Sequence, residues 1–290
     1  DVLQRLAKMR IVFLIDEIHR SNSGDQHEEM ISIFDELQAP FDNPLYARIR
    51  TQKNLIIGFT ATPNDHALAR FGEFSGYAEN EKLWRPFDSY TMREAIEDGY
   101  ILNPLQNIVP IASRMLFSLP KNKLEGFTEK EFKDAQKKQI YEDPERIDAI
   151  AAKVADLLVK DVYRQIRGTG KAMLAVYSIK AARRYFTALK KHFAQVTQQA
   201  KYARYAEAPI QIVYSSSQDE ESASALNNMS EEKALQRFCA AKNGLIIVVA
   251  KLQTGFDEKK LHTLFLDKEI RGISAIQTIS RVNRTTKYKN

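Results

Sequence analysis

The run Val-Phe-Leu-Ile-Asp-Glu-Ile-His at residues 12–19 joins four apolar residues to two carboxylates and a histidine. Continuous apolar runs that are rich in β-branched residues and do not alternate are typical of strands buried on both faces of a parallel sheet. Five further runs of this kind follow, at residues 55–59, 173–177, 210–214, 245–249 and 263–266. Apolar residues recur near the 3.6-residue helical period at 143–164 and 179–193. This alternation of strands and helices predicts an α/β fold with parallel sheets flanked by helices.

The composition is typical of a globular protein with a sizeable core. The chain has 290 residues, 44% hydrophobic and 28% charged, which suits two domains and excludes wholesale disorder. Lys and Arg number 43 against 37 Asp and Glu, a mild excess compatible with a polyanionic partner. The longest apolar run, 245–250, is too short to cross a membrane, which takes about 18 residues. With a single cysteine and no metal-ligand spacing of histidines, we expect a cytoplasmic protein without a membrane partner, disulfide or structural zinc.

The expected domain boundary lies in the Lys- and Glu-rich stretch 121–138, where the alternation of strands and helices is interrupted. We predict a first domain over residues 1–115, a helical connection over 116–145 and a second domain over 146–290. The chain begins without an initiator Met or a signal-peptide layout. We therefore expect a fragment whose first domain is truncated at its N-terminus.

Polar side chains that could carry chemistry follow the first two apolar runs. Ligands of open α/β sheets bind at the carboxyl ends of strands, where Asp16 could hold a phosphate-bound Mg²⁺ and Glu17 could orient or deprotonate a water. The alternative is that the acidic pair ends a strand and caps the next helix. Thr60 and Thr62 end the second run and could hydrogen-bond to the acidic pair or to His19, transmitting the state of a nucleotide. Taken alone, this Thr-Pro stretch would indicate a turn.

Two arginines near the end of the chain could bind phosphate. A helix over residues 274–284 would place Gln277, Arg281 and Arg284 on one stripe, at i, i+4 and i+7. A guanidinium group grips phosphate oxygens bidentately, and one that enters a cleft from a second domain can act as an arginine finger. The alternative is a solvated basic helix face.

A glycine-containing loop follows the run at 245–249. Backbone amides near Thr254 and Gly255 could meet a phosphate, and Asp257 could meet a ribose or a partner arginine. By itself a Thr-Gly loop is weak evidence for a nucleotide site.

The stretch Gly-Thr-Gly-Lys at residues 168–171 has the look of a phosphate-binding loop but does not fit its pattern. Gln165 stands where the first glycine is required, and Ala172 follows the lysine in place of Ser or Thr. We expect Lys171 to lead into the strand at 173–177 instead.

Together these stretches resemble the motor of superfamily 2 helicases, the group that includes the DEAD/DEAH-box proteins. The corresponding motifs II to VI would be residues 16–19, 60–63, 175–179, 254–257 and 277–284. Two further passages, 86–101 and 251–257 followed by 261–268, are similar to the restriction (R) subunit of type I restriction endonucleases, and the similarity covers nearly the whole chain. The resemblance implies two RecA-like domains.

In that family the R subunit pairs a nuclease domain with an ATP-driven motor that pulls double-stranded DNA while it is bound to methylation and specificity subunits. The resemblance thus implies ATP and Mg²⁺ as cofactors, and DNA and those two subunits as partners, with Asp16 as the metal residue. The implied roles are catalysis for Glu17, Arg281 and Arg284, nucleotide contact for Asp16, Gly255, Asp257 and Gln277, coupling for His19, Thr60 and Thr62, and DNA contact for Ser178 and Thr254.

The sequence departs from the family pattern in several ways. No phosphate loop precedes motif II and no nuclease domain is recognisable, so we expect this chain alone to bind ATP weakly or not at all and to be inactive. Lys251 stands where the family pattern predicts Asp. Two alternatives are another superfamily 2 motor, such as a helicase or a type III restriction subunit, and a non-catalytic module for DNA binding or subunit docking. Residues 86–101 favour the type I family over the first.

Overall fold

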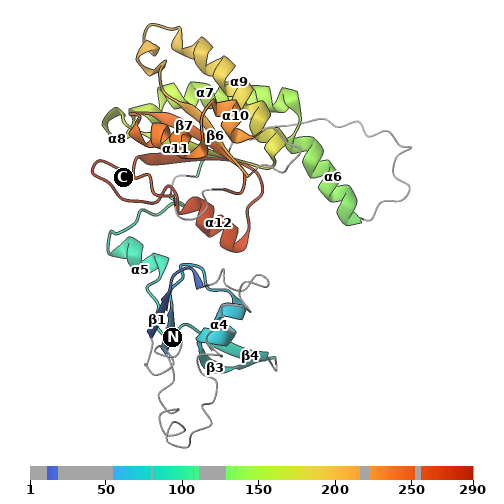
Figure 1. The fold of residues 1–290 in the computed structure, drawn as a ribbon, viewed down its shortest axis with the longest axis vertical. Helices are drawn as coiled ribbons and strands as arrows, with labels where there is room; N and C mark the ends of the chain where they lie inside the picture. The colour runs from blue at the N-terminus through green and yellow to red at the C-terminus, as the bar shows by residue number, and fades with distance from the viewer. Residues whose placement is uncertain are drawn as a thin grey trace, which may run out of the picture. The chain divides into compact units, whose positions relative to one another are not determined.

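The computed structural model divides into two compact units, Asp1–Thr91 and Met92–Asn290 (Figure 1). The residues that it describes are 12–18, 55–79, 81–106, 108–110, 129–215, 222–251 and 256–289. Each unit contains parallel strands, and helices flank the larger sheet. The predicted α/β class with a parallel sheet is therefore confirmed. The domain boundaries expected at residues 115 and 145 stay a prediction.

The first unit contains a parallel pair of strands, a helix and an antiparallel hairpin. Their bounds are β1 (Val12–Ile15), β2 (Leu55–Gly58), α4 (Asp65–Phe71), β3 (Glu73–Ala78) and β4 (Glu81–Arg85). In the parallel pair, Ile15 lies opposite Gly58. The hairpin was not predicted, because its contacts are aromatic: Phe74 packs edge-on against Tyr77 and Trp84, and no aliphatic run marks these strands.

The second unit is built on a four-stranded sheet in the order β6-β7-β5-β8, with all neighbouring strands parallel. Its strands are β5 (Lys171–Val176), β6 (Ile210–Val213), β7 (Gly244–Val248) and β8 (Leu261–Asp267). Together with β1 and β2, these strands confirm the six apolar runs as strands. The expected burial on both faces was wrong for β1, where Val12 and Leu14 are exposed.

Strands β5, β6 and β7 are buried on both faces, which explains why they are almost entirely apolar, whereas Leu266 of β8 is exposed. Leu174 of β5 points into a core shared with Leu158 and Leu189, which lie on the helices of one face. Its neighbour Met173 points into a second core on the opposite face, where it meets Phe238. Successive residues of a strand point to opposite faces, so each needs an apolar side chain.

The helices of the second unit are capped by side chains in only some cases. They are α5 (Met92–Glu97), α6 (Glu129–Tyr141), α7 (Pro144–Lys160), α8 (Gln165–Gly168), α9 (Ile179–Thr197), α10 (Ala223–Asn227), α11 (Glu231–Ala240) and α12 (Gly272–Ile279), with 3-10 turns at Val162–Arg164 and Ala203–Tyr205. Asp143 caps α7 and Ser178 caps α9, each accepting a hydrogen bond from a first-turn N–H group. The predicted helices at 143–164 and 179–193 are thereby confirmed. Every helix in the described ranges is too short or too polar to span a lipid bilayer.

Lys171 begins β5, as predicted, and is fully buried. Its ammonium group donates hydrogen bonds to the Cys239 carbonyl (2.8 Å) and to Glu258 Oε2 (2.7 Å). The Gly-Thr-Gly stretch before it is held by Asn243, whose side-chain amide donates to the carbonyl groups of Gly168 (3.1 Å) and Gly170 (3.0 Å). This glycine-containing turn therefore serves the packing of β5.

Replacing Lys171 by methionine is expected to destabilise the second unit by about 3 kcal/mol, because the change strands the buried Glu258 carboxylate without its cation. Urea unfolding of the two proteins measures this difference. Lys260→Met is the matched control, since only the backbone N–H of Lys260 bonds to Glu258 (2.9 Å) and that bond survives. A loss below about 1 kcal/mol for Lys171→Met would show that the ion pair is not a determinant of stability.

Candidate functional site

In the first unit, the structure brings the stretch after β1 next to the stretch after β2. Phe59 bridges them: its N–H donates to the Ile15 carbonyl (2.8 Å), and its carbonyl accepts from the Ile18 N–H (3.1 Å). The acidic pair Asp16 and Glu17 therefore lies at the same sheet edge as the threonines that follow Phe59. This juxtaposition is the one that the sequence predicted.

Glu17 adopts a backbone conformation that is unusual for a residue with a side chain, with φ of 53°. The Asp16 carboxylate stabilises this turn by accepting a hydrogen bond from the Glu17 N–H (2.8 Å). Behind the turn, Ile18 is buried against Gly58, where an added Cβ would lie 2.3 Å from the Ile18 side chain. Asp16 itself is exposed. Left-handed non-glycine residues at strand ends are strained, and such strain is concentrated at functional sites.

The two threonines after β2 form a compact turn. The Thr62 N–H donates to the Thr60 hydroxyl (3.0 Å), and Thr62 is buried. The turn interpretation of this stretch is therefore correct, and it is compatible with a second role in coupling. His19 lies outside the described residues, so the coupling role of the three residues stays a prediction.

In the second unit, the predicted helix over residues 274–284 is shorter than expected. Helix α12 ends at Ile279, so Gln277, Arg281 and Arg284 do not share one helical stripe. Arg281 lies in the turn after the helix, and Arg284 lies in an extended segment. The prediction of a single helical stripe was wrong.

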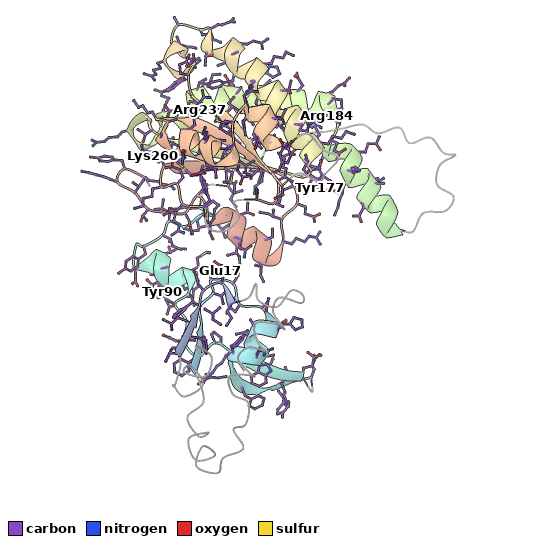
Figure 2. The ribbon with its side chains drawn as sticks, in the orientation of Figure 1. Glu17, Tyr90, Tyr177, Arg184, Arg237 and Lys260 are labelled. Atoms are coloured by element: carbon purple, nitrogen blue, oxygen red, sulfur yellow. The ribbon has the colours of Figure 1, made fainter. Side chains whose placement is uncertain are left out.

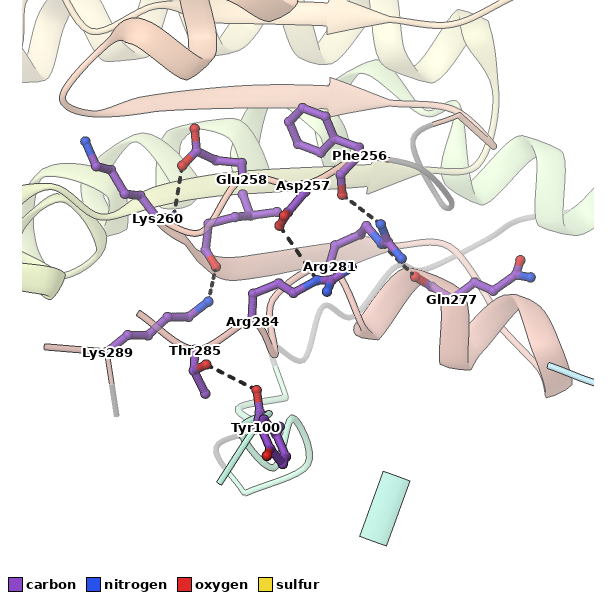
Figure 3. A network of polar contacts seen from close by, with 11 residues as sticks. Tyr100, Phe256, Asp257, Glu258, Lys260, Gln277, Arg281, Arg284, Thr285 and Lys289 are labelled. Carbon is purple, nitrogen blue, oxygen red and sulfur yellow. Dashed lines mark hydrogen bonds and ion pairs between the residues drawn. The ribbon is translucent and has the colours of Figure 1, made fainter. Parts of the chain in front are cut away.

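The cause is a strand-like contact with a distant segment of the same unit. Ile101 forms an antiparallel bridge with Arg284. Two hydrogen bonds flank it, from the Leu102 N–H to the Asn283 carbonyl (2.8 Å) and from the Thr285 hydroxyl to the Tyr100 carbonyl (3.1 Å; Figure 3). Because residues 283–285 pair with this segment, they cannot continue the helix. Sequence reasoning missed the contact, since no local pattern marks a single bridge.

Both arginines nevertheless reach the segment that follows the predicted Thr-Gly loop (Figure 3). The Arg281 guanidinium donates to the Phe256 carbonyl (2.7 Å) and to the Gln277 carbonyl (3.3 Å). Arg284 forms an ion pair with Asp257, with 3.7 Å between Nε and Oδ1. The structure thus brings together four of the predicted residues of this unit: Asp257, Gln277, Arg281 and Arg284. Asp257 pairs with an arginine, which was one of its two predicted partners.

The remaining predicted residues of this unit lie elsewhere or outside the described residues. Ser178 follows β5, caps α9 and donates to Glu142 Oε1 (2.8 Å). Thr254 and Gly255 lie outside the described residues, so their phosphate and DNA contacts stay predictions. Lys251, at the start of that loop, forms an ion pair with Glu231 (2.5 Å). The positive charge that stands where the family pattern predicts Asp is therefore balanced by a carboxylate of the same unit.

A buried polar network at the end of β8 was not predicted. Asp267 accepts hydrogen bonds from Arg146 Nη1 (2.9 Å) and from the Tyr185 hydroxyl (2.7 Å). Burial, and then the negative charge of Asp267, raise the pKa of Tyr185 far above its ordinary value. Close by, Tyr141 stacks on Tyr177 with 5.0 Å between ring centroids. These contacts hold the ends of β5 and β8 in place. Sequence reasoning missed the network because no short motif marks its members.

These features define an α/β protein whose parallel strands lead into carboxylates, hydroxyls and arginines, the residue types with which α/β proteins bind phosphate-bearing ligands. Residues 235–290 match the family model described as type I restriction enzyme subunit R domain 3. The resemblance to the R subunits of type I restriction enzymes is thus confirmed at the level of sequence.

The alignments with relatives extend this match to nearly the whole chain. The chain is 26% identical over 315 residues to the type I restriction enzyme SsaAORF53P endonuclease subunit of Staphylococcus saprophyticus, covering 99% of this chain and 30% of that protein. It is also 26% identical over 322 residues to the SauCOLORF180P endonuclease subunit of Staphylococcus aureus, with the same coverage of 99% and 30%. The chain therefore spans about 30% of the length of these relatives.

Among solved structures, the ATP-dependent Type ISP restriction-modification enzyme LlaBIII bound to DNA aligns with a TM-score of 0.42 and 11% sequence identity. This alignment covers 96% of this chain and 17% of that one.

Proposed function

We propose that the chain forms part of the ATP-driven double-stranded DNA translocase of a type I restriction enzyme, built from two RecA-like domains. The observation that carries the proposal is the edge of the first unit, where Asp16 and Glu17 are joined through Phe59 to the turn at Thr60 and Thr62. This edge lies in a chain that aligns over 99% of its length with restriction endonuclease subunits. Carboxylates at such an edge suit phosphoryl transfer to water.

The acidic pair fits a magnesium-bound nucleotide by its chemistry and exposure. Asp16 is exposed at a strand end and offers hard carboxylate oxygens, the ligands that Mg²⁺ prefers. When bound there, Mg²⁺ neutralises charge on the phosphate oxygens. Glu17 is held in its strained turn beside Asp16, where its carboxylate would orient the attacking water and accept a proton from it. Among the described residues, no cluster of three metal-binding side chains offers a rival site.

The two arginines are expected to have different roles. Arg281 is committed to two backbone carbonyl groups and would hold residues 256–257 in place. Arg284 is half-exposed, and its ion pair with Asp257 is long and solvent-accessible, so it can exchange that partner for a phosphate at little cost. We therefore propose Arg284 as the arginine finger, with Gln277, Asp257 and Gly255 contacting the nucleotide.

The proposed partners are double-stranded DNA and the methylation and specificity subunits of a cytoplasmic restriction complex. DNA would be held through its phosphates, with Ser178 and Thr254 as candidate contacts. Binding through phosphates releases counterions, so the affinity for duplex DNA is expected to fall steeply as salt rises.

The proposal is tested by measuring ATP hydrolysis by the complete subunit with and without duplex DNA, together with a strand-displacement assay. We expect hydrolysis that duplex DNA stimulates and movement that does not separate the strands. Strand separation would indicate a helicase instead. Salt-sensitive duplex binding with no ATP hydrolysis would indicate a non-catalytic DNA-binding or docking module.

A further inference from the structure

A short segment after helix α5 lies beside Arg284, the residue proposed above as the arginine finger. The chain enters the second unit just after Tyr90 (labelled in Figure 2), and helix α5 follows directly. Residues 99–102 then lead the chain to the extended segment 283–285, which carries Arg284. They include the end of passage 86–101, which resembles the R subunit and to which the proposed function gives no role.

Gly99 turns the chain from the helix into this segment. Its φ of 75° lies in the left-handed region, where residues with a side chain are strained. Its N–H donates to the Ile96 carbonyl (3.1 Å), and the Tyr100 N–H donates to the Ala95 carbonyl (2.9 Å). These two bonds form a Schellman motif, a common way for a glycine to end a helix. The glycine therefore ends α5 and directs the residues after it away from the helix.

The segment holds the backbone of Arg284 on both sides. The two hydrogen bonds that flank the bridge to Ile101 involve the residues immediately before and after Arg284. Further along the chain, the buried Lys289 ammonium group donates to the Leu261 carbonyl (2.7 Å) and anchors the same stretch. The backbone around Arg284 is thus fixed, whereas its side chain is half-exposed and reaches the half-exposed Asp257.

We propose that residues 99–102 are a positioning element for Arg284. They fix its backbone so that the guanidinium group stays beside Asp257 and can exchange that carboxylate for a phosphate. This inference rests on the proposed function of Arg284 as the finger. A long side chain reaches one point reproducibly only when its Cα atom is held, and a displacement of about 1 Å in a reacting group can cost about a hundredfold in rate.

The test is the DNA-stimulated ATP turnover of the complete subunit with Thr285→Val, which removes the hydroxyl donor to the Tyr100 carbonyl. We expect kcat to fall by roughly two- to tenfold, the effect of one lost hydrogen bond, with KM for ATP unchanged. Thr285→Ser keeps the hydroxyl and should restore kcat. Thr187→Val is the matched control, because the exposed Thr187 hydroxyl also donates to a backbone carbonyl, that of Arg183 (3.2 Å), within helix α9.

Combination with Arg284→Ala shows whether the segment acts through the finger. A positioning element has no effect once the group that it positions is gone, so Thr285→Val should lower kcat no further in the Arg284→Ala protein. An equal fold-loss in both backgrounds overturns the proposal. Unchanged kcat in a variant with both Thr285→Val and Leu102→Pro also overturns it, because proline has no N–H and this variant lacks both flanking bonds. Should Leu102→Pro fail to fold, the result with Thr285→Val alone decides.

The same measurements separate this proposal from the proposed function on which it rests. If Arg284→Ala lowers turnover while Thr285→Val does not, the finger assignment stands and the positioning role fails. If Arg284→Ala itself leaves turnover unchanged, the finger assignment fails, and the positioning role fails with it.

Discussion

Glutamine in place of Glu17 is expected to lower the DNA-stimulated ATP turnover of the complete subunit by about a hundredfold or more, the usual effect of losing a general base. The amide has the size of the carboxylate but cannot accept a proton from water. The turn itself should survive, because its stabilising hydrogen bond runs from the Glu17 N–H to Asp16. ATP affinity should therefore be unchanged, and the loss should appear in kcat.

The control for this variant lies in the same unit. Glu79 also has a left-handed backbone, with φ of 47°, but it lies in the turn between β3 and β4, away from the acidic pair. Glu79→Gln makes the same chemical change in the same backbone conformation and should leave turnover unaffected. If Glu17→Gln also left turnover unaffected, Glu17 would not be the base. A loss of ATP affinity would instead mean that Glu17 binds the nucleotide.

The strands and the edge residues of the first unit could be predicted because their signals are local. A strand that is buried on both faces has to be apolar at every position, so β5 and β7 stand out in the sequence. Parallel strands end at the same edge, so the residues after β1 and β2 had to lie together once both were identified as strands. The Phe59 hydrogen bonds confirm this reasoning.

The segment around Arg284 escaped prediction because its conformation depends on a contact between residues far apart in the sequence. A 3.6-residue period favoured a helix through Arg284, but the bridge to Ile101 is a tertiary contact that overrides it. No sequence window contains both partners of this bridge. The hairpin of β3 and β4 escaped for a different reason: its strands are close in sequence but pack through aromatic residues and have no aliphatic run.

Alanine in place of Arg284 is expected to lower ATP turnover by roughly a thousandfold, the effect typical of losing an arginine finger. It should leave thermal unfolding unchanged, because the ion pair of Arg284 with Asp257 is long and about half-exposed, and such surface pairs contribute little stability. Arg281→Ala should also lower turnover, but it should do so by destabilising the second unit. Its guanidinium group donates to the Phe256 and Gln277 carbonyl groups, and losing charged hydrogen bonds of this kind costs about 1.5–3 kcal/mol.

Measuring both turnover and urea unfolding for each variant separates the two roles. Arg164→Ala is the control, since this exposed arginine of the same unit also donates to a backbone carbonyl, that of Lys160 (3.5 Å), away from the site. Unchanged turnover in both Arg281→Ala and Arg284→Ala would remove the arginine finger from this chain. Equal destabilisation by the two would show that Arg284 is as firmly built into the fold as Arg281. Only a variant that loses turnover while keeping its full free energy of unfolding marks a group whose partner is the nucleotide rather than the protein.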